Sequence, residues 1–486
     1  MYVLGVDFGG GASKATLLEE TGKVVATATS EYKTITVGEN GREQNPEDWY
    51  NATKENIRAV IKKSKINGKE IAALCFDAAT HTAVLTDENG KPVMNSVYWT
   101  DTRSVKEKKY LEENYGEEIF RKFKHNADTI WTLPQLMWVK ENKPEEWKRV
   151  KRITFAKDYV RGKFTGDFVT DYIEAEGSML FDYDTMRWDE KFLSLIGITE
   201  ENLPKIVTPL TVTGKVKKEI AEEFGFDENV KVICGATDTA TEVFAAGAIK
   251  KGQTTLKLAT AGRICVVNDK LAPDKNVINY SHVIKGLYYP GTATKSCAAS
   301  LRWFRDAFGG DYAEYDEQAK KIPVGSDGLI FHPYLSGELT PYANPMLKGS
   351  FTGITGAHTK GHFARAVMEG VAMSMKDCKE YIGGLGVKIE SAFRIGGGAK
   401  SDVWSGMIAD ALQIKLVKTE NNDSSFGSAM LAGIAAGFFK DPEEAIEKCS
   451  VVTGEILPDK ERGEEYAKLF IRYKKIQKAL EEIYNA

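Results

Sequence analysis

The chain has 486 residues, enough for two to four domains at roughly 100–200 residues per domain. Hydrophobic residues make up 42% of it and charged residues 28%, a balance typical of folded globular proteins that excludes a disordered chain. Lys and Arg number 65 against 69 Asp and Glu, so the formal net charge is -4. With no basic excess to bind a nucleic-acid backbone, we expect no nucleic-acid partner.

The opening segment and the cysteines bear on where the protein works. No stretch approaches the roughly 18–20 continuous apolar residues of a membrane span. The opening MYVLGVDFGG has no basic leader and carries Asp7 where a signal peptide needs apolar residues. Six cysteines lie far apart without metal-finger spacing, namely Cys75, Cys234, Cys265, Cys297, Cys378 and Cys449. We therefore expect a cytoplasmic protein with reduced, mostly buried thiols and no membrane partner.

The first predicted elements are strands around a glycine loop. Residues 2–6 form a short apolar strand, the loop DFGGGA follows at 7–12, and strand patterns occupy 14–19 and 24–30. A Walker-type phosphate loop would lead into a helix, whereas a strand follows here, so that interpretation fails. The pattern instead predicts a β-hairpin with a glycine-rich turn.

Helical and strand patterns then alternate through the first half. Helices are predicted at 48–63, 132–142 and 239–248, and strands at 71–76 and 229–234, while alternation is weak at 83–86. The last of these strands runs into the loop GATD, which ends at Asp238.

The opening pattern recurs in the second half. A strand at 254–258, a small-residue loop at 259–262 and a strand at 263–268 repeat the hairpin. Further on, a strand at 392–395 is followed by three glycines and a helix at 401–412; another helix is expected at 429–437, and the tail from Asp459 is charged and helical. This alternation indicates an α/β architecture, and the repeat predicts two related domains that divide near residue 245.

Two carboxylates follow strands and admit two interpretations each. Backbone N–H groups of Gly9, Gly10 and Gly11 could form a nest for phosphate, where Asp7 would need a divalent cation such as Mg²⁺ between itself and the phosphate. Alternatively, Asp7 hydrogen-bonds its own turn. Asp238 could be a general base at the mouth of a cleft or simply the N-cap of the next helix.

Three further segments are candidates for ligand contacts. The loop GGGAKS at 396–401 could lie against a planar ring or ribose, or it could be a tight turn in which Ser401 caps a helix. His81 could bind a ligand or be structural. In VYWTDTR, Asp101 and Arg103 could bind vicinal hydroxyls while Trp99 covers a sugar face, or the charged residues could form a surface ion pair.

Together these segments resemble the FGGY family of carbohydrate kinases, and within it the xylulokinases, over nearly the whole chain to about residue 440. The resemblance is carried by GVDFGGGASK, GREQNPEDWY, TLPQLMWVKENKPEEW, AKDYVRGKFTGDFVTDYIEAEGSMLFDYDTMRW, CGATDTA, GLIFHPYLSGELTPYANPMLKGSFTGIT, FARAVMEGVA and GGGAKSDVWSGMIADALQ. The last four are specific in combination, because their order and spacing match as a set.

The resemblance implies two actin-like, ribonuclease H-like domains with a catalytic cleft between them. Residues 1–245 would form the sugar-binding domain and residues 246–486 the nucleotide-binding domain. Asp7 would help to place Mg²⁺, and Asp238 would be the base that deprotonates the acceptor hydroxyl. The implied ATP-binding residues are Gly9, Gly10, Gly11, Ser13, Lys14, Thr260, Gly262, Gly397, Gly398 and Ser401. The implied sugar-binding residues are His81, Trp99, Asp101 and Arg103, together with Asp238.

Several positions depart from the xylulokinase pattern. AATHT at 78–82 stands where that group has G-Q-M-H-G, and TDTR at 100–103 stands where it has N-D-x-R. The first phosphate loop has Gly10 and Gly11 in place of hydroxyl residues, and the second reads ATAG at 259–262 instead of G-T-S-G. The altered pocket leaves the identity of the sugar open.

The resulting prediction is ATP-dependent phosphorylation of a small sugar, a ketopentose such as D-xylulose first, with another ketose or a polyol, D-ribulose among them, as the alternative. A non-kinase actin-like ATPase and a sugar sensor without catalysis are the competing hypotheses. The expected partners are the small-molecule sugar and ATP. A homodimer is considered as the form in which the protein assembles.

Overall fold

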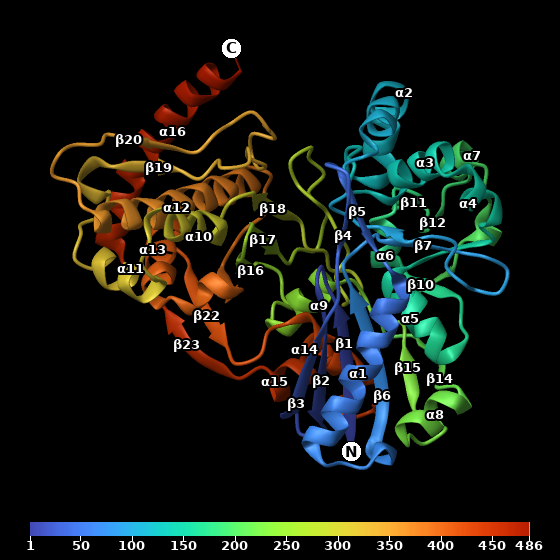
Figure 1. Ribbon diagram of the computed structural model, residues 1–486. Helices are drawn as coiled ribbons and strands as arrows, with labels where there is room; N and C mark the ends of the chain where they lie inside the picture. Colours follow the sequence, from blue (N-terminus) through green and yellow to red (C-terminus); the bar gives the residue numbers. More distant parts are fainter. Residues whose placement is uncertain (486) are drawn as a thin grey trace. The chain divides into compact units, whose positions relative to one another are not determined.

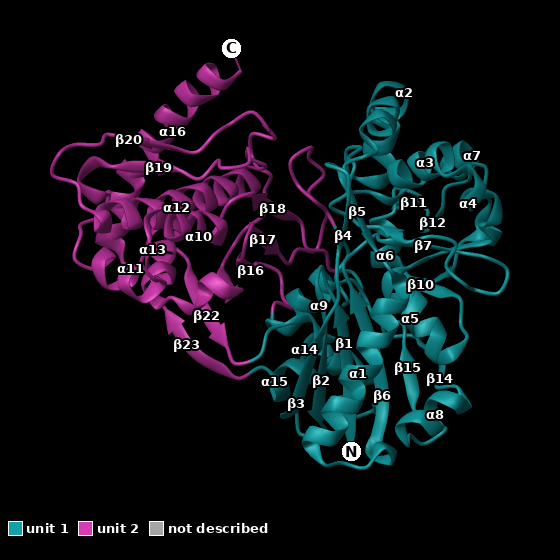
Figure 2. Cartoon of the chain, in the orientation of Figure 1, with its two compact units in different colours: residues 1–247, 280–286, 421–450 teal, residues 248–279, 287–420, 451–486 magenta. Residues whose placement is uncertain are grey.

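The computed structural model describes residues 1–485, which fold into two compact units (Figure 2). Unit 1 contains residues 1–247, 280–286 and 421–450, and unit 2 contains residues 248–279, 287–420 and 451–486. The chain therefore passes from one unit to the other repeatedly. A single division near residue 245 does not describe this arrangement, because residues 421–450 pack within unit 1.

Unit 1 is built on a six-stranded sheet in the order β14-β15-β6-β1-β2-β3 (Figure 1). Its strands are β1 (Tyr2–Phe8), β2 (Ala12–Glu19), β3 (Val24–Glu31), β6 (Ile71–Ala78), β14 (Val212–Lys215) and β15 (Lys231–Ile233). The first three strands run antiparallel to one another, β6 and β15 run parallel to β1, and β14 is antiparallel to β15.

Helices cover the central strands of this sheet and bury their side chains. α1 (Pro46–Ser64) packs on β2 and β3, whereas α14 (Ser424–Ala436) packs on β1, β2 and β6. Of β1, only Tyr2 and Asp7 are not fully buried. A strand buried on both faces reads as a continuous apolar run, which is how YVLGV appears in the sequence.

Unit 2 repeats this design. Its six-stranded sheet has the order β18-β17-β16-β21-β22-β23. The strands are β16 (Gln253–Leu258), β17 (Gly262–Val266), β18 (Gly291–Thr294), β21 (Ser391–Ile395), β22 (Lys415–Thr419) and β23 (Val452–Ile456). The antiparallel trio β16–β17–β18, the parallel strands β21 and β22 and the antiparallel edge strand β23 correspond in order and direction to those of unit 1. The repeat expected from the two hairpins is thus present.

The remaining elements surround the two sheets. Unit 1 also contains β4 (Ile35–Val37), β5 (Gly41–Gln44), β7 (Ala83–Thr86), β8 (Ser96–Val97), β9 (Arg152–Phe155), β10 (Val169–Asp171), β11 (Phe181–Asp182), β12 (Arg187–Trp188), β13 (Lys205–Val207), α2 (Val105–Phe123), α3 (Thr132–Asn142), α4 (Pro144–Arg149), α5 (Ala156–Thr165), α6 (Tyr172–Glu176), α7 (Glu190–Ile196), α8 (Lys218–Phe224), α9 (Asp238–Ala245) and α15 (Pro442–Cys449). Unit 2 also contains β19 (Ile330–His332), β20 (Ser350–Thr352), α10 (Ala298–Phe308), α11 (Tyr312–Ala319), α12 (Lys360–Gly384), the 3₁₀ turn η4 (Gly397–Lys400), α13 (Asp402–Leu412) and α16 (Lys460–Tyr484).

The elements that the sequence pattern predicted are present with the predicted type, and they differ mainly at their ends, whereas β18, β22, β23 and α12 were not predicted. The helix expected at 429–437 begins earlier, at Ser424, because the side chain of Asp423 accepts a hydrogen bond from the amide of Phe426 and caps it. Polar residues in this first turn hid it from an apolar pattern. The six cysteines are all buried and free, as expected. Within residues 1–485 we find no helix that combines the length and the apolar character of a membrane span.

Candidate active site

Two aspartates lie side by side at the ends of neighbouring parallel strands. Asp7 on β1 is in register with Asp77 on β6, and each carboxyl group affects the pKa of the other. Asp77 is fully buried, and its Oδ2 accepts a hydrogen bond from Oγ of Ser428 on α14 at 2.5 Å. The prediction singled out Asp7 alone. The pair arises because parallel strands bring their carboxyl ends to one edge of the sheet.

The environment of this pair disfavours two negative charges. Burial, together with the nearby carboxylates of Asp238 and Asp423, raises the pKa of Asp7 from 3.8 to about 7. Burial and the charge of Asp7 also raise the pKa of Asp77 well above its ordinary value. Oδ1 of Asp7 and Oδ1 of Asp77 are buried, and within the described chain neither has a hydrogen-bond donor. Acceptor oxygens without donors in a low-dielectric site fit a cation such as Mg²⁺.

Asp238 belongs to the same group of carboxylates. It is the first residue of α9, and Ala78 at the end of β6 bridges to Thr237 just before it. The N-cap of α9 is Thr237, whose side chain accepts from the amide of Ala240, so the interpretation of Asp238 as the cap is wrong. Oδ1 of Asp238 instead accepts from the amide of Thr239 at 2.6 Å. The half-buried carboxylate of Asp238 therefore lies at the N-terminus of α9, and Thr237 is the residue that caps this helix.

Asp423, which the sequence interpretation missed, connects α14 to the first hairpin. Its Oδ2 accepts a hydrogen bond from Nζ of Lys14 at 2.8 Å, and its Oδ1 accepts one from Oγ of Ser425 at 2.5 Å. Lys14 is thus engaged in an ion pair with this carboxylate. Ser13, one of the predicted ATP-binding residues, is fully buried in β2, so its side chain faces the core of unit 1.

The glycine loop is fixed through its carbonyl groups. The hydroxyl of Tyr32 donates to the carbonyl of Gly9 at 2.6 Å, while Oγ1 of Thr34 and Nε2 of Gln44 donate to that of Gly10 at 2.6 and 3.0 Å. Gly10 and Gly11 are exposed. A Cβ at Gly11 would meet nothing within 4 Å, so the surrounding protein leaves open space above the loop. Such space suits the close approach of an anion to backbone amides.

His81 occupies a constrained position next to the acidic cluster. It follows β6, has φ of +56°, in the left-handed region, and is buried. Its amide donates to Oε1 of Glu174 at 2.5 Å, its carbonyl accepts from Oγ1 of Thr132 at 2.8 Å, and its ring lies edge-on to Trp131 with centroids 5.0 Å apart. The first two contacts hold the backbone of His81, and the third packs its ring against Trp131.

The segment around Asp101 has a structural role that the sequence did not indicate. Asp101 is 1% exposed; its Oδ2 accepts from the amide of Arg42 at 2.7 Å, and both its oxygens accept from Nε of Arg103. Arg103 also pairs with Glu43 at 2.9 Å and stacks on Trp138. The ion pair offered as the alternative interpretation is therefore present, but it is largely withdrawn from the surface, with Arg103 14% exposed.

The two charged side chains are therefore committed to protein partners that stabilise the β5 region. Of the three predicted sugar-binding residues in this segment, Trp99 is the most accessible to a ligand, at 38% exposed.

Unit 2 holds the second loop, between β16 and β17. The carbonyl of Thr260 accepts from the amide of Cys297 at 2.9 Å, and the carbonyl of Ala259 accepts from the amide of Ala298 at 2.8 Å, so the loop rests on the start of α10. A Cβ at Gly262 would lie 2.8 Å from both Sδ of Met375 and Cγ2 of Thr294. Packing alone therefore requires glycine at position 262.

The glycine run after β21 turns sharply into α13. Gly396 has φ of +87°, and a Cβ there would lie 2.8 Å from the carbonyl oxygen of Leu258, whereas a Cβ at Gly397 would meet nothing within 4 Å. Oγ of Ser401 accepts from the amide of Trp404 at 3.0 Å and donates to the carboxylate of Asp316 at 2.8 Å. The interpretation of Ser401 as a helix cap is confirmed, and the open surface at this turn lies over Gly397.

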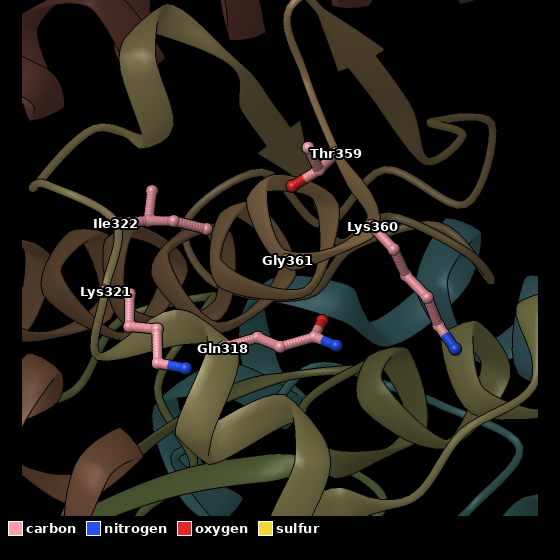
Figure 3. A pocket seen from close by; sticks show the side chains of 6 residues that line it. All are labelled: Gln318, Lys321, Ile322, Thr359, Lys360 and Gly361. Carbon is pink, nitrogen blue, oxygen red and sulfur yellow. The ribbon is translucent and has the colours of Figure 1, made fainter.

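A surface hollow of about 250 Å³ also lies in unit 2, next to the start of α12 (Figure 3). It is lined by Gln318, Lys321, Ile322, Thr359, Lys360 and Gly361. It contains none of the predicted site residues, so we do not assign the site there.

Within unit 1, Asp7, Asp77, Asp238 and Asp423 influence one another electrostatically, and unit 2 by itself contains the loops at Thr260 and Gly397. The two six-stranded sheets have the same strand order and define a two-domain α/β fold. The acidic cluster at the strand ends of one sheet suits this fold to phosphate chemistry.

Comparison with known proteins identifies the family. The N-terminal domain of the FGGY family of carbohydrate kinases matches residues 2–245, and its C-terminal domain matches residues 268–436. The xylulose kinase of Bacillus subtilis (strain 168) is 32% identical over 98% of this chain and 96% of its own, and the gluconokinase of Bacillus licheniformis is 29% identical over 100% and 97%. The ligand-bound xylulose kinase from Lactobacillus acidophilus has a TM-score of 0.93 at 27% identity, covering 100% of this chain and 99% of its own.

The chain therefore belongs to the FGGY family of carbohydrate kinases. It is an ATP-dependent sugar kinase, and the predictions of family, fold and enzyme class are confirmed.

Proposed function

We propose that the protein transfers the γ-phosphoryl group of ATP to a primary hydroxyl of a small open-chain sugar, with Asp238 as the general base. The carboxylate of Asp238 would accept the hydroxyl proton while the sugar oxygen attacks the γ-phosphorus and ADP leaves. The position of Asp238 carries this proposal: it lies at the N-terminus of α9, which Thr237 caps, and close enough to Asp7 to raise the pKa of that group. A helix N-terminus also favours the negative charge that gathers around a phosphoryl group.

Asp7 is proposed to hold the Mg²⁺ of the nucleotide. When bound with ATP, Mg²⁺ supplies neutralisation of the charge on the phosphate oxygens. The donor-free, buried Oδ1 of Asp7 is the ligand type that this cation prefers. The exposed amides at Gly10 and Gly11 would orient the phosphates beside it, while Lys14 stays paired with Asp423.

The nucleotide is proposed to use the loops of the second half and the sugar those of the first. Residues 246–486 would bind ATP through Thr260, Gly262, Gly397 and Gly398, with Ser401 fixing the turn. Residues 1–245 would bind the sugar around His81, Trp99 and Asp238, with Asp101 and Arg103 supporting this region. His81 has the strongest support, because two hydrogen bonds hold its left-handed backbone and its ring packs against Trp131.

The acceptor is proposed to be a ketopentose such as D-xylulose. Relatives named xylulose kinase and others named gluconokinase match the chain at similar identity. An aldonate would bring a carboxylate to a pocket whose neighbours Asp238, Asp7 and Asp77 are acidic, whereas a neutral ketose would not meet that repulsion. Another ketose or a polyol, D-ribulose among them, remains the alternative.

Two further points extend the proposal beyond the reaction itself. Six buried cysteines outside any disulfide are typical of a reducing compartment, so we propose a cytoplasmic location. The assembly of two copies of this chain into a homodimer stays a prediction.

A coupled ADP-release assay tests the function. ADP release should rise sharply when D-xylulose is added, and D-ribulose, ketohexoses, polyols and gluconate should give lower kcat/KM. In Asp238→Asn the sugar-dependent kcat should fall by about 10²–10⁴-fold with little change in sugar affinity, since a general base typically contributes that much. Asp227→Asn, in an exposed turn, is the matched control and should behave as the wild type.

The outcomes separate the competing functions. Equal kcat in Asp238→Asn would remove Asp238 from the mechanism. ADP release that is fast and independent of every sugar would favour a non-kinase ATPase, and sugar binding without any turnover would favour a sensor.

A further inference from the structure

We propose that Asp77 is a second carboxylate of the cation site, so that this protein holds Mg²⁺ through an Asp7–Asp77 pair and not through Asp7 alone. The inference rests on the proposed function, which needs a cation near Asp7, and it extends that function to a residue with no role in it so far.

The backbone places the two carboxylates together. β1 and β6 are parallel neighbours in the sheet, and their register pairs Val6 with Phe76, Asp7 with Asp77 and Phe8 with Ala78. Paired residues of adjacent strands project from the same face, so these two carboxyl groups lie next to each other. The geometry is therefore set by the sheet and not by a flexible loop.

Asp77 has an oxygen that the protein leaves without a donor. Its side chain is 0% exposed, so water from bulk solvent does not reach it. Ser428 donates to its Oδ2 and fixes the orientation of the carboxyl group. Oδ1 has no hydrogen-bond donor among residues 1–485, and the same holds for Oδ1 of Asp7. Two buried acceptor oxygens in contacting groups need a positive partner, because a carboxylate buried without compensation costs several kcal/mol.

The charged groups around the Asp7–Asp77 pair also favour a bound cation. The carboxylates of Asp238 and Asp423 lie close enough to affect Asp7 electrostatically. Lys14 contributes its positive charge to Asp423, with Nζ 2.8 Å from Oδ2. Lys14 is thus engaged with Asp423, and a divalent cation would offset the mutual repulsion of the carboxyl groups of Asp7, Asp77 and Asp238.

Two carboxylates also match the way proteins hold Mg²⁺. This ion is usually bound through one or two carboxylates together with substrate phosphates and water. A site made of Asp7, Asp77 and nucleotide phosphates meets that pattern. Ser428 would act as the residue that orients the second ligand, and removal of such supporting hydrogen bonds typically weakens metal affinity by about 10–100-fold.

Cation affinity measured on the full-length protein tests this directly. Mn²⁺ serves as the probe, and its binding is followed by electron paramagnetic resonance and by calorimetry, with and without a non-hydrolysable ATP analogue. Asp77→Asn keeps the volume of the side chain and a partner for Ser428, and it should weaken Mn²⁺ binding by about 10-fold or more. Ser428→Ala should weaken it less, and Asp227→Asn should leave it unchanged.

Each result has a defined meaning. Wild-type Mn²⁺ affinity in Asp77→Asn, with weaker binding in Asp7→Asn, would overturn the role of Asp77 and leave the proposed function intact; a proton shared by the pair would give that result. Unchanged affinity in both variants would overturn the cation site of the proposed function as well. If Asp77→Asn fails to fold, Ser428→Ala decides, because wild-type affinity there would contradict the orienting role on which the pair depends.

Discussion

Gly5 is a residue at which the packing of unit 1 leaves no room for a side chain. It lies inside β1 against α14, and a Cβ at this position would lie 2.0 Å from the carbonyl oxygen of Ser425 and 2.2 Å from the amide nitrogen of Ala429. Both obstacles are backbone atoms, so no side-chain rotation relieves the clash. β1 and α14 both carry candidate site residues, and their approach depends on this one missing methyl group.

We predict that Gly5→Ala destabilises the protein by about 2–3 kcal/mol or more, since overpacking a close-packed core costs that much. Gly116→Ala is the matched control: Gly116 lies within α2, a Cβ there meets nothing within 4 Å, and alanine should add about 0.5–1 kcal/mol. Urea unfolding followed by circular dichroism measures both. Equal midpoints for Gly5→Ala and the wild type would show that α14 can move away from β1 without cost.

At this scale the sequence allowed some site residues to be found and not others. Asp7 and Asp238 each end an apolar strand and precede a glycine loop or a helix, which is a local signal. Asp77 gives a comparable signal at the end of ALCFDA, a carboxylate in an otherwise apolar run, and it could have been found. Asp423 has no such signal, because its place beside Lys14 depends on a chain crossing that joins residues 409 positions apart.

The segment Tyr280–Gly286 belongs to unit 1 although the strands before and after it, β17 and β18, belong to unit 2. It is held mainly by Glu176, which is fully buried at the end of α6. The carboxylate of Glu176 accepts from the amide of Ser281 at 2.8 Å and from its hydroxyl at 2.5 Å. Burial nevertheless raises the pKa of Glu176 from 4.5 to about 8, so the folded protein binds this proton more tightly than the unfolded chain does.

We predict that this group makes stability fall as the pH rises. Its contribution is fully present below about pH 4.5 and is lost as the pH rises through about 8, by up to about 1.4 kcal/mol for each pH unit in that window. Glu176→Gln cannot ionise, so its unfolding free energy should depend less on pH between 5 and 8. Thermal and urea unfolding of both proteins at four pH values measures this. Parallel curves would contradict the prediction.

Elements were predicted more reliably than their ends and partners. Hairpins, alternation and glycine loops are local features, so the sequence indicated β1–β2, β16–β17 and the turn into α13 at nearly their observed residues. The docking of Ser281 on Glu176 and the partly buried Asp101–Arg103 pair are tertiary contacts of polar residues. No periodicity distinguishes such residues from an exposed loop, which is why a surface location was expected for the Asp101–Arg103 pair.

For the whole molecule, the proposed reaction requires residues from both units to engage one nucleotide. The candidate base and cation ligands belong to unit 1, whereas the loops at Thr260 and Gly397 belong to unit 2. We therefore predict that sugar and a non-hydrolysable ATP analogue together reduce the radius of gyration, because excluding water protects ATP from hydrolysis. Small-angle X-ray scattering measures this, with each ligand alone as the control. An unchanged radius with both ligands bound would count against closure.

Residues 421–450 enter unit 1 after more than 170 residues spent mostly in unit 2, and they bring α14 to the strands β1 and β6. A fragment that stops at residue 247 would lack this helix, and the apolar side chains of both strands that α14 covers would face water. Such a fragment should aggregate when produced alone, and adding residues 421–450 as a separate peptide should restore part of its solubility. The family's N-terminal domain is thus a unit of sequence comparison that, in this protein, depends for folding on the far end of the chain.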